Sequence, residues 1–343
     1  MTLETPAITR AVPQAGPKRV AVIGGGNNSE HDVSLASAAA VAAALDPDRF
    51  DVVTLTLEHD HSWSNGLGHR LTLADAVQML SGCDVAIPML HGRHGEDGTI
   101  AALLELANVA YIGSGVQAGA LGMNKWATKL LAQSMNIAVA PSTLLTRATI
   151  DSFKWEYPVV VKPVQGGSSH GVSLARSESE WGEALEAAFA FDDCVLVEDL
   201  VVGKEIDVPV LRTASGDLRA GPAIEIITDG LFDTHAKYGG AAEFRIPAAL
   251  TEEETNALRD AAVSMFDALG CRGVARIDFF LTASGVVLNE VNTAPGFTAD
   301  SQVPLSFAAE GLPLPQLLEL LIDDALRSSG AMPPVSARAT TDD

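Results

Sequence analysis

Two short apolar runs near the C-terminal end carry polar side chains at alternate positions. The polar residues are Arg276, Asp278, Glu290 and Asn292. In a β-strand, residues i and i+2 share a face, so each pair of polar groups points to one side of its strand. A hairpin with a three-residue loop over 283–285 pairs residue 278 with 290 and residue 276 with 292. All four polar groups then meet on one face.

This predicted cluster has a definite chemistry. Two carboxylates directly opposite each other repel, and a bridging cation removes that repulsion. Oxygen ligands from two carboxylates and one amide suit Mg²⁺ that also holds substrate phosphates. Two alternatives remain open: a solvated hairpin face with a single Arg276–Asp278 ion pair, and a four-residue loop that puts Asp278 and Glu290 on opposite faces.

A second candidate is the loop 165–171, Gln-Gly-Gly-Ser-Ser-His-Gly, which follows the strand-like run 158–163. Its glycines and serines offer backbone N–H groups and hydroxyls that suit phosphate oxygens. Lys162 precedes the loop, and a lysine in a buried strand usually has a partner. An ordinary Gly-rich turn is the alternative. The Gly-x-Ser-x-Gly pattern over 167–171 also matches a serine-hydrolase elbow, which requires a following helix. The run after the loop alternates like a strand.

The N-terminal part has two more polar loops. The run 24–29, Gly-Gly-Gly-Asn-Asn-Ser, follows a strand but holds Ser29 at the third glycine position of a dinucleotide fingerprint, so that motif is incomplete. Glu30 then either caps a helix or holds a substrate ammonium. The loop 90–98 precedes another predicted helix, where Asp97 is a candidate cap and the loop can place polar groups or anions.

The elements that must position these residues follow from apolar periodicity. Strands are predicted at 19–23, 51–57, 84–89, 158–163, 172–175, 195–198, 206–211, 223–227, 274–281 and 286–290. Helices are predicted after residue 29 and at 75–80, 99–107, 125–134, 178–189, 252–269 and 314–326, with a junction at 113–119. Strands that alternate with helices over 19–113 predict a parallel, Rossmann-like unit, followed by two mixed α+β units. The predicted division is 1–18 (flexible tail), 19–122, 123–203, 204–328 and 329–343 (flexible tail).

Composition narrows the classes of function. The chain has 343 residues, with 22 Lys plus Arg against 44 Asp plus Glu and a net charge of −22. Such acidity disfavours nonspecific binding to nucleic acid or anionic membrane. Three scattered cysteines without a paired motif indicate a reduced, cytoplasmic location and no zinc site. The N-terminus shows no apolar signal segment, and no run is long enough to predict a membrane-spanning helix.

Taken together, the motifs resemble the D-alanine–D-alanine ligase family of the ATP-grasp superfamily over about residues 19–326. The resemblance rests on combined segments, each weak alone: 25–34, 91–98, 113–115, 161–171, 236–238, 275–278 and 289–296. It implies a Rossmann-like N-terminal domain followed by a two-part ATP-grasp module, with ATP and two Mg²⁺ (or Mn²⁺) as cofactors, and a homodimer.

The resemblance also implies roles for individual residues. Catalytic roles fall to Glu30, Ser168, Lys237, Tyr238, Arg276 and the backbone of Gly296, and substrate contacts to Glu30, His91, Arg276, Ser301 and Gln302. ATP contacts fall to Lys125, Lys162, Ser168, Glu198, Asp199, Leu200, Val201, Glu205, Lys237 and Asn289. The metal ligands are Asp278, Glu290 and Asn292. Glu30, Ser168 and Tyr238 resemble a hydrogen-bonded triad that closes the loop 237–243 over the site.

The implied reaction is ATP-dependent joining of two D-alanines through an acyl phosphate, for peptidoglycan precursor synthesis. Gln302 departs from the apolar residue usual at its position, so a different second substrate, such as D-serine, D-lactate or another amino acid, is the alternative. Two further hypotheses are a serine hydrolase and a nonenzymatic sensor of amino acids or nucleotides. The first predicts loss of activity in Ser169→Ala without any need for ATP, and the second predicts binding without ADP release.

Overall fold

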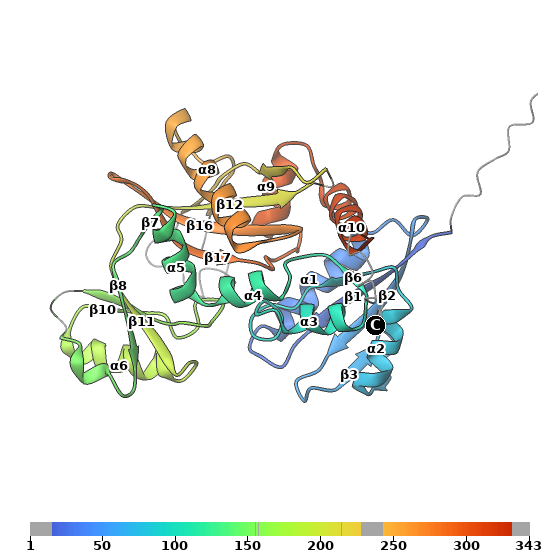
Figure 1. Ribbon diagram of the computed structural model, residues 1–343, viewed down its shortest axis with the longest axis horizontal. Coiled ribbons are helices and arrows are strands. Elements are labelled where there is room, and N and C mark those ends of the chain that lie inside the picture. The colour runs from blue at the N-terminus through green and yellow to red at the C-terminus, as the bar shows by residue number, and fades with distance from the viewer. Residues whose placement is uncertain (1–15, 155, 157, 214, 228–242, 331–343) are drawn as a thin grey trace, which may run out of the picture.

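The computed structural model describes residues 16–154, 156, 158–213, 215–227 and 243–330. They form three sheets with their helices, which lie along the chain in the order blue, green and orange in Figure 1. The α/β architecture predicted from the sequence is confirmed.

The N-terminal sheet has six strands in the order β4-β3-β2-β1-β5-β6. Its central pairs are parallel, as predicted, whereas β3 and β4 pair antiparallel at one edge. The elements are β1 (Lys18–Gly25), α1 (His31–Ala44), β2 (Phe50–Leu57), β3 (Trp63–Asn65), β4 (Arg70–Leu71), α2 (Leu73–Ser81), β5 (Val85–Pro88), α3 (Thr99–Leu106) and β6 (Ala110–Tyr111). Strands of two or three residues, such as β3, β4 and β6, are too short to show an alternating pattern.

The second sheet is antiparallel, in the order β10-β9-β11-β8. Two helices precede it, and the first of them occupies much of the predicted junction. The elements of this region are α4 (Val116–Met123), α5 (Lys125–Ser134), β7 (Ala138–Val139), β8 (Ser142–Thr146), the 3-10 helix η1 (Ile150–Ser152), β9 (Val159–Pro163), β10 (Ser173–Ala175), α6 (Glu178–Phe189) and β11 (Cys194–Asp199). The short strand β7 belongs instead to the third sheet, where it pairs parallel to β17.

The third sheet runs β15-β14-β12-β16-β17-β7, with β13 paired to β12. Its elements and the two helices that follow are β12 (Lys204–Arg212), β13 (Leu218–Ala220), β14 (Ile224–Ile227), β15 (Glu243–Arg245), α8 (Glu252–Leu269), β16 (Val274–Thr282), β17 (Gly285–Asn292), α9 (Gln302–Ala309) and α10 (Leu314–Gly330). Each predicted tail overlaps one element. The tail 1–18 overlaps β1, which begins at Lys18, and the tail 329–343 overlaps α10, which continues to Gly330.

The last helix returns to the first sheet. Leu317, Leu321 and Ile322 of α10 are buried in one cluster with Val20 and Val85 of the N-terminal strands. Figure 1 shows α10 beside α1 and β6. The burial of this apolar face fixes the third sheet against the first, so the loops of both can contribute to one site.

The hairpin of β16 and β17 differs from its prediction in an instructive way. Thr282 pairs with Gly285, so the loop has two residues rather than three. The register then shifts between Phe279 and Asp278, because β17 contains a β-bulge that places one extra residue there. The bulge offsets the shorter loop, and Asp278 still lies opposite Glu290.

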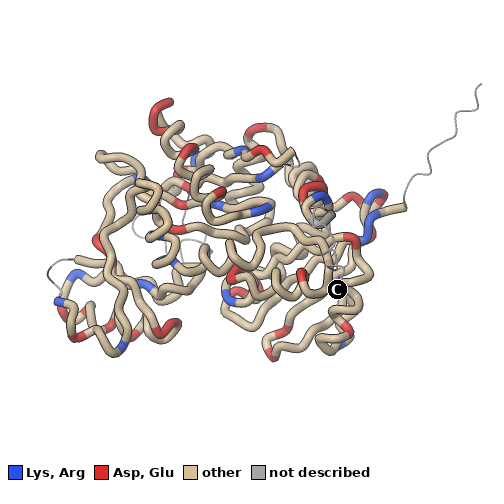
Figure 2. The backbone as a smooth tube through the Cα atoms, in the orientation of Figure 1, with Lys and Arg blue, Asp and Glu red and all other residues tan. Residues whose placement is uncertain are grey.

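The acidic residues are spread along the chain. Figure 2 shows acidic residues on all three parts of the described chain. No single helix among the described residues is long and apolar enough to cross a membrane; α9 and the first part of α10 reach that length only as a pair bent by 103°.

Candidate functional site

The predicted polar cluster forms on the β16–β17 hairpin. Asp278 accepts hydrogen bonds from Nε and Nη2 of Arg276 at 2.8 and 2.7 Å, and from Nδ2 of Asn292 at 2.8 Å. Asp278 is 4% exposed and Arg276 8% exposed, so the alternative of a solvated hairpin face is wrong. The carboxylates of Asp278 and Asp207 outweigh burial and raise the pKa of Arg276, which is therefore charged at all working pH values.

The other predicted carboxylate of the hairpin faces a helix. Glu290 Oε2 lies 3.4 Å from Nζ of Lys125, the first residue of α5. A lysine at a helix N-terminus faces the positive end of the helix dipole, which is unfavourable without anionic partners. Glu290 and the carbonyl oxygen of Gly166, which accepts from the same ammonium at 2.6 Å, provide that compensation.

A pocket of about 590 Å³ lies between the second and third sheets. Lys125, Lys162, Asn289 and Glu290 line one end. The predicted ATP contacts Glu198, Asp199, Leu200, Val201 and Glu205 line it too, with the apolar side chains of Val160, Leu174 and Phe280. An apolar slot with cations at one end suits a nucleotide, because the base packs against carbon and the phosphates meet the ammonium groups.

Beneath this pocket, one buried carboxylate holds two lysines. Glu198 lies 2.9 Å from Nζ of Lys162 and 3.0 Å from Nζ of Lys129. Burial alone would raise the pKa of Glu198, but the two ammonium groups outweigh it and hold the pKa below its usual value. Burial also lowers the pKa of Lys129 to about 8, with Glu198 opposing the shift. The side chain of Glu198 is thus committed to lysines, and only its backbone remains for a nucleotide base.

The Gly-rich loop joins two antiparallel strands, β9 and β10, with no helix after it. The serine-hydrolase elbow is therefore excluded, since it needs a strand–turn–helix geometry. Ser168 and Ser169 have φ of 48° and 56°, a left-handed conformation that is rare outside glycine. In this conformation the Ser168 hydroxyl donates a hydrogen bond to Oε1 of Glu30. Ser169, which was not predicted, lines the nucleotide pocket instead of Ser168.

Glu30 connects that loop to the N-terminal sheet. It occupies the N-cap position of α1, but its side chain makes no capping hydrogen bond, so the capping alternative is wrong. Its carboxylate is 7% exposed. A Cβ added at Gly167 would lie 2.7 Å from Oε2 of Glu30, and one at Gly92 would lie 2.2 Å away. A side chain at either position would displace this carboxylate, and Gly92 also has a φ of 71°, which favours glycine.

A second pocket, of about 480 Å³, meets the first at Gly167. The predicted substrate residues Glu30, His91, Arg276, Gly296, Ser301 and Gln302 all line it, together with Ser168 and Asn292. They come from the loop before α1, the loop before α3, the strands β16 and β17, and the start of α9. Folding thus brings together residues that lie up to 272 positions apart (30 to 302).

His91 is held on both ring nitrogens. Nε2 lies 2.9 Å from the Ser37 hydroxyl, and Nδ1 lies 3.0 Å from the carbonyl oxygen of Ala294. The carbonyl oxygen can only accept, so Nδ1 carries the proton. Burial lowers the pKa of His91, which favours the neutral ring. Nearby, Glu96 accepts from the backbone N–H of Gly92 at 2.9 Å, and burial followed by the charge of Glu30 raises its pKa to about 8.

Helix α9 begins at the far wall of this pocket. Ser301 is its N-cap residue, but the Ser301 hydroxyl turns back to the N–H of Thr298 at 3.0 Å. The first N–H groups of α9 thus have no side-chain cap among the described residues, and a helix start of this kind attracts carboxylates. A Cβ at Gly296 would lie 2.9 Å from Oγ of Ser301, so a side chain there would displace this hydroxyl.

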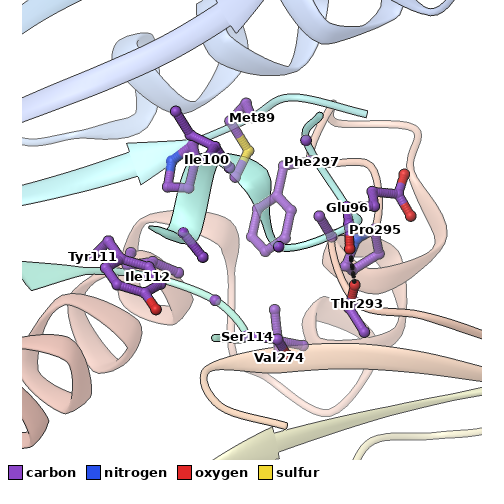
Figure 3. A pocket seen from close by; sticks show the side chains of 16 residues that line it. Met89, Glu96, Ile100, Tyr111, Ile112, Ser114, Val274, Thr293, Pro295 and Phe297 are labelled. Carbon is purple, nitrogen blue, oxygen red and sulfur yellow. Dashed lines mark hydrogen bonds between the residues drawn. The ribbon is translucent and has the colours of Figure 1, made fainter. Parts of the chain in front are cut away.

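A small cavity lies behind the second pocket, where β5 and α3 meet the segment after β17 (Figure 3). Met89, Ile100, Phe297 and Val274 line it, and Thr293 donates a hydrogen bond to the carbonyl oxygen of Glu96 at 3.3 Å. Its volume of about 30 Å³ has room for one or two water molecules and none for an amino acid. This contact therefore joins the two sheets without adding a substrate site.

Besides Ser169, three residues in or beside the two pockets were not predicted. Lys129 stands four positions after Lys125, a spacing that places both on one face of α5 and could have revealed it. Asp207 is the lone charge in the apolar run 206–211, the same signal that identified Lys162. Glu96 lies in a motif that was noted, but no role was inferred for it.

Two predicted residues, Lys237 and Tyr238, lie outside the described residues, as do 237–242 of the predicted lid. In the loop before α3, Asp97 accepts from the N–H of Thr99 at 3.0 Å, but the N-cap residue of the helix is Gly98 and no side chain makes a capping hydrogen bond there.

Comparison with known proteins agrees with this geometry. Residues 19–79 and 69–114 match the family model described as D-ala D-ala ligase N-terminus, and residues 131–323 match D-ala D-ala ligase C-terminus. The D-alanine--D-alanine ligase of Corynebacterium aurimucosum is 38% identical over 92% of this chain and 99% of its own length. That of Mycolicibacterium smegmatis is 38% identical over 91% and 96%.

Two solved structures are similar over most of the chain. The VanG D-Ala:D-Ser ligase from Enterococcus faecalis has a TM-score of 0.79 and 32% identity, and the match covers 90% of this chain and 99% of that one. The D-alanine--D-alanine ligase from Bacillus anthracis complexed with ATP has a TM-score of 0.76 and 26% identity, with 91% and 99% covered.

Proposed function

The chain belongs to the D-alanine–D-alanine ligase family, and we propose that it joins two molecules of D-alanine while ATP is converted to ADP and phosphate. The observation that carries this proposal is the meeting of two pockets at Gly167, one suited to a nucleotide and the other to amino acids. The product would serve peptidoglycan precursor synthesis.

For ATP, we propose that Lys125 and Lys162 bind the phosphates, with Asn289 beside them. Lys162 Nζ donates to Oδ1 of Asn289 at 3.3 Å, so the lysine is already directed toward the hairpin. The strand end 198–201 would line the adenine, and Glu205 would accept the ribose hydroxyls. Glu198 acts here through its backbone, because its carboxylate holds Lys129 and Lys162.

The donor set on the hairpin fits two Mg²⁺ (or Mn²⁺). Asp278 and Glu290 lie opposite each other, and Asn292 uses Nδ2 toward Asp278, which leaves its Oδ1 as a possible ligand. No cluster of three or more His, Cys, Asp and Glu among the described residues suits a metal, so amide and phosphate oxygens must complete the coordination. Such cations, when bound, neutralise the charge that develops on the transferring phosphoryl group.

For the amino acids, we propose that Glu30 accepts the ammonium of the first D-alanine. His91, with both ring nitrogens held, shapes the pocket around it. Ser301 and the start of α9 would bind the carboxylate of the second D-alanine. The guanidinium of Arg276 and the N–H of Gly296 would stabilise the oxyanion of the tetrahedral intermediate.

The proposed reaction has two steps, activation of one carboxylate and attack on it by an amine. A carboxylate is a poor electrophile, so the first D-alanine attacks the γ-phosphate of ATP and becomes an acyl phosphate, with ADP released. The deprotonated amine of the second D-alanine attacks that carbonyl, and phosphate leaves. We propose that Lys237 contacts the phosphoryl group, and that Tyr238 joins Glu30 and Ser168 in closing the loop 237–243, which excludes water from the acyl phosphate.

The test is ADP release by the purified protein. Release should require both D-alanine and Mg²⁺, and the dipeptide should be found by mass. Glu290→Ala should abolish it, whereas Glu319→Ala, which removes a half-buried carboxylate of α10 that pairs with Arg49, should not. Equal ADP formation without any amino acid would refute the proposal. The curated relatives do not favour D-serine or D-lactate as the second substrate, and both serve as comparison substrates in the assay.

The remaining features of this proposal are a homodimer in the cytoplasm and the division at 19–122, 123–203 and 204–328. Sedimentation and limited proteolysis of the full chain measure the first and last of these.

A further inference from the structure

Three carboxylates stand in register across three neighbouring strands of the third sheet. Asp207 of β12 is opposite Asp278 of β16, which is opposite Glu290 of β17. Asp207 is 1% exposed and lines neither large pocket. Carboxylates in directly opposite positions repel, so this row needs cations beside it. Arg276 is the cation that lies between Asp207 and Asp278.

The contacts of Arg276 fix the plane of its guanidinium. Nε lies 2.8 Å from Oδ1 of Asp278 and 3.0 Å from Oδ2 of Asp207. Nη2 donates to Asp278 at 2.7 Å, and Nη1 donates to Oε1 of Gln302 at 2.5 Å. A guanidinium carries five N–H groups in one plane. Among the described residues these contacts use one N–H of each nitrogen, which leaves one on Nη1 and one on Nη2 for the pocket that Arg276 lines.

Gln302 is held at both ends of its amide. Oε1 accepts from Arg276, while Nε2 donates to Oδ2 of Asp207 at 2.6 Å. The same oxygen of Asp207 therefore receives both Gln302 and Arg276. Gln302 lines the substrate pocket, yet its polar end is committed to this buried network. The wall that it presents to a substrate is consequently its aliphatic part.

We propose that Asp207 and Gln302 are a positioning pair for Arg276: together they set the direction of its guanidinium and withhold the Gln302 amide from the second amino acid. The inference rests on the proposed function, in which Arg276 stabilises the oxyanion. It also explains how a polar residue at position 302 is compatible with a second substrate as small and apolar as the methyl group of D-alanine.

The pair makes distinct predictions for kinetics. Replacing Asp207 with leucine removes one partner of the guanidinium and frees Nε2 of Gln302, while Asp278 still holds Nε and Nη2 of Arg276. The guanidinium can then shift, and misplacement of a catalytic group by about 1 Å costs up to ~100-fold in rate. We expect kcat to fall about 10- to 100-fold, with the KM for ATP within about twofold of the wild type, because the oxyanion contact forms mainly in the transition state. Use of D-serine relative to D-alanine should rise about 3- to 10-fold, since the released amide can bind a hydroxyl.

Conservative and double variants separate positioning from folding. Asp207→Asn keeps one oxygen that can accept from both partners, so kcat should stay within about fivefold of the wild type. Gln302→Leu should lower kcat about 10-fold, and the Asp207→Leu/Gln302→Leu double variant should be no worse than the poorer single variant, because residues that act as a unit are not additive. Ser306→Ala is the matched control: it removes a 2.6 Å hydrogen bond to Pro222 from a buried residue of α9 that does not contact Arg276.

A direct readout needs no turnover. In the full-length protein, the Nε–H resonance of Arg276, assigned by its loss in Arg276→Lys, should exchange slowly with water in the wild type and in Asp207→Asn. Exchange should be faster in Asp207→Leu, where only Asp278 still accepts from this N–H. The positioning pair is refuted if exchange is unchanged in Asp207→Leu, if Asp207→Asn is as impaired as Asp207→Leu, or if Ser306→Ala loses the same activity. A wild type that forms no dipeptide refutes the proposed function instead, and the exchange measurement still decides the pair.

Discussion

The buried carboxylate of Glu198 provides the most demanding test of the site's electrostatics. In Glu198→Gln, Lys129 and Lys162 lose the one carboxylate that lies within 3.0 Å of both. Lys129 is 2% exposed and already has a pKa near 8 with Glu198 present. Without it, the pKa must fall further, because an ammonium in this setting is costly. We therefore expect Lys129 to lose its proton at neutral pH.

The magnitude follows from the burial. Removal of one partner of a buried ion pair costs about 3–5 kcal/mol. If unfolding is cooperative, the entropy of unfolding is about 2.1 cal/mol/K per residue, or roughly 0.6 kcal/mol/K for ~300 ordered residues, so Tm should drop by about 5–8 °C. The loss should shrink as the pH rises toward about 8, because folded Lys129 of the variant has already released the proton that the wild type still holds, so the variant gains stability with pH over that range and the wild type does not. Above that pH, Lys129 is neutral in both folded proteins and the difference should stay constant.

A paired variant shows whether charge is the cause. In Lys129→Met/Glu198→Leu one buried lysine and its carboxylate become apolar, a replacement that is often neutral. Only Lys162 then keeps a buried charge without its carboxylate, so the double variant should be more stable than Glu198→Gln and less stable than the wild type. ATP binding should still be weak, because Lys162 no longer has Glu198 to orient it. Thermal unfolding by circular dichroism and ATP titration by calorimetry measure the two effects. The reasoning is wrong if Glu198→Gln changes Tm by less than 2 °C, or if the double variant is no more stable than the single one.

The remaining predictions concern Glu96, the bulge and the contact between Glu30 and Ser168. The pKa of Glu96 is raised to about 8, so the stability of the wild type should fall as the pH rises from about 4.5 to 8, and Glu96→Gln should flatten that slope in urea titrations at several pH values; an unchanged slope contradicts the assignment. Deletion of Asn289 removes the bulge while Asp278 stays opposite Glu290, so thermal unfolding should change little; deletion of Val287 instead turns Leu288 away from the core and should cost about 2–5 kcal/mol. Equal stability of the two deletion variants would show that the register is set elsewhere. Ser168→Ala removes the hydroxyl that donates to Glu30, so the KM for the first D-alanine should rise about 10-fold with the KM for ATP within twofold, and an unchanged KM for D-alanine would contradict that role.

Part of the site could be derived from the sequence because its geometry is local. Asp278 and Glu290 belong to one hairpin. Strand periodicity alone places Arg276 on the face of Asp278, and Asn292 on the face of Glu290. The predicted pairing of Asp278 with Glu290 was right, although the predicted three-residue loop was wrong. A two-residue loop followed by a bulge of one residue in β17 gives the same pairing at the site as a three-residue loop. A bulge gives no clear signal in the sequence, because Asn289 has no distinctive neighbours.

Helices α5, α6 and α8 begin and end at the predicted residues, because caps such as Ser177 and Thr251 are local signals. Other contacts join residues that are distant in the sequence. Glu198 pairs with two lysines, the carboxylate of Glu30 lies against two glycines, and Gln302 donates to Asp207. No periodicity reports contacts of that kind. The sequence by itself determined the element types, the polar face of the hairpin and the resemblance to a ligase family. The tertiary structure alone decided which charges are buried together, because burial strengthens each pairing and makes each unpaired charge costly.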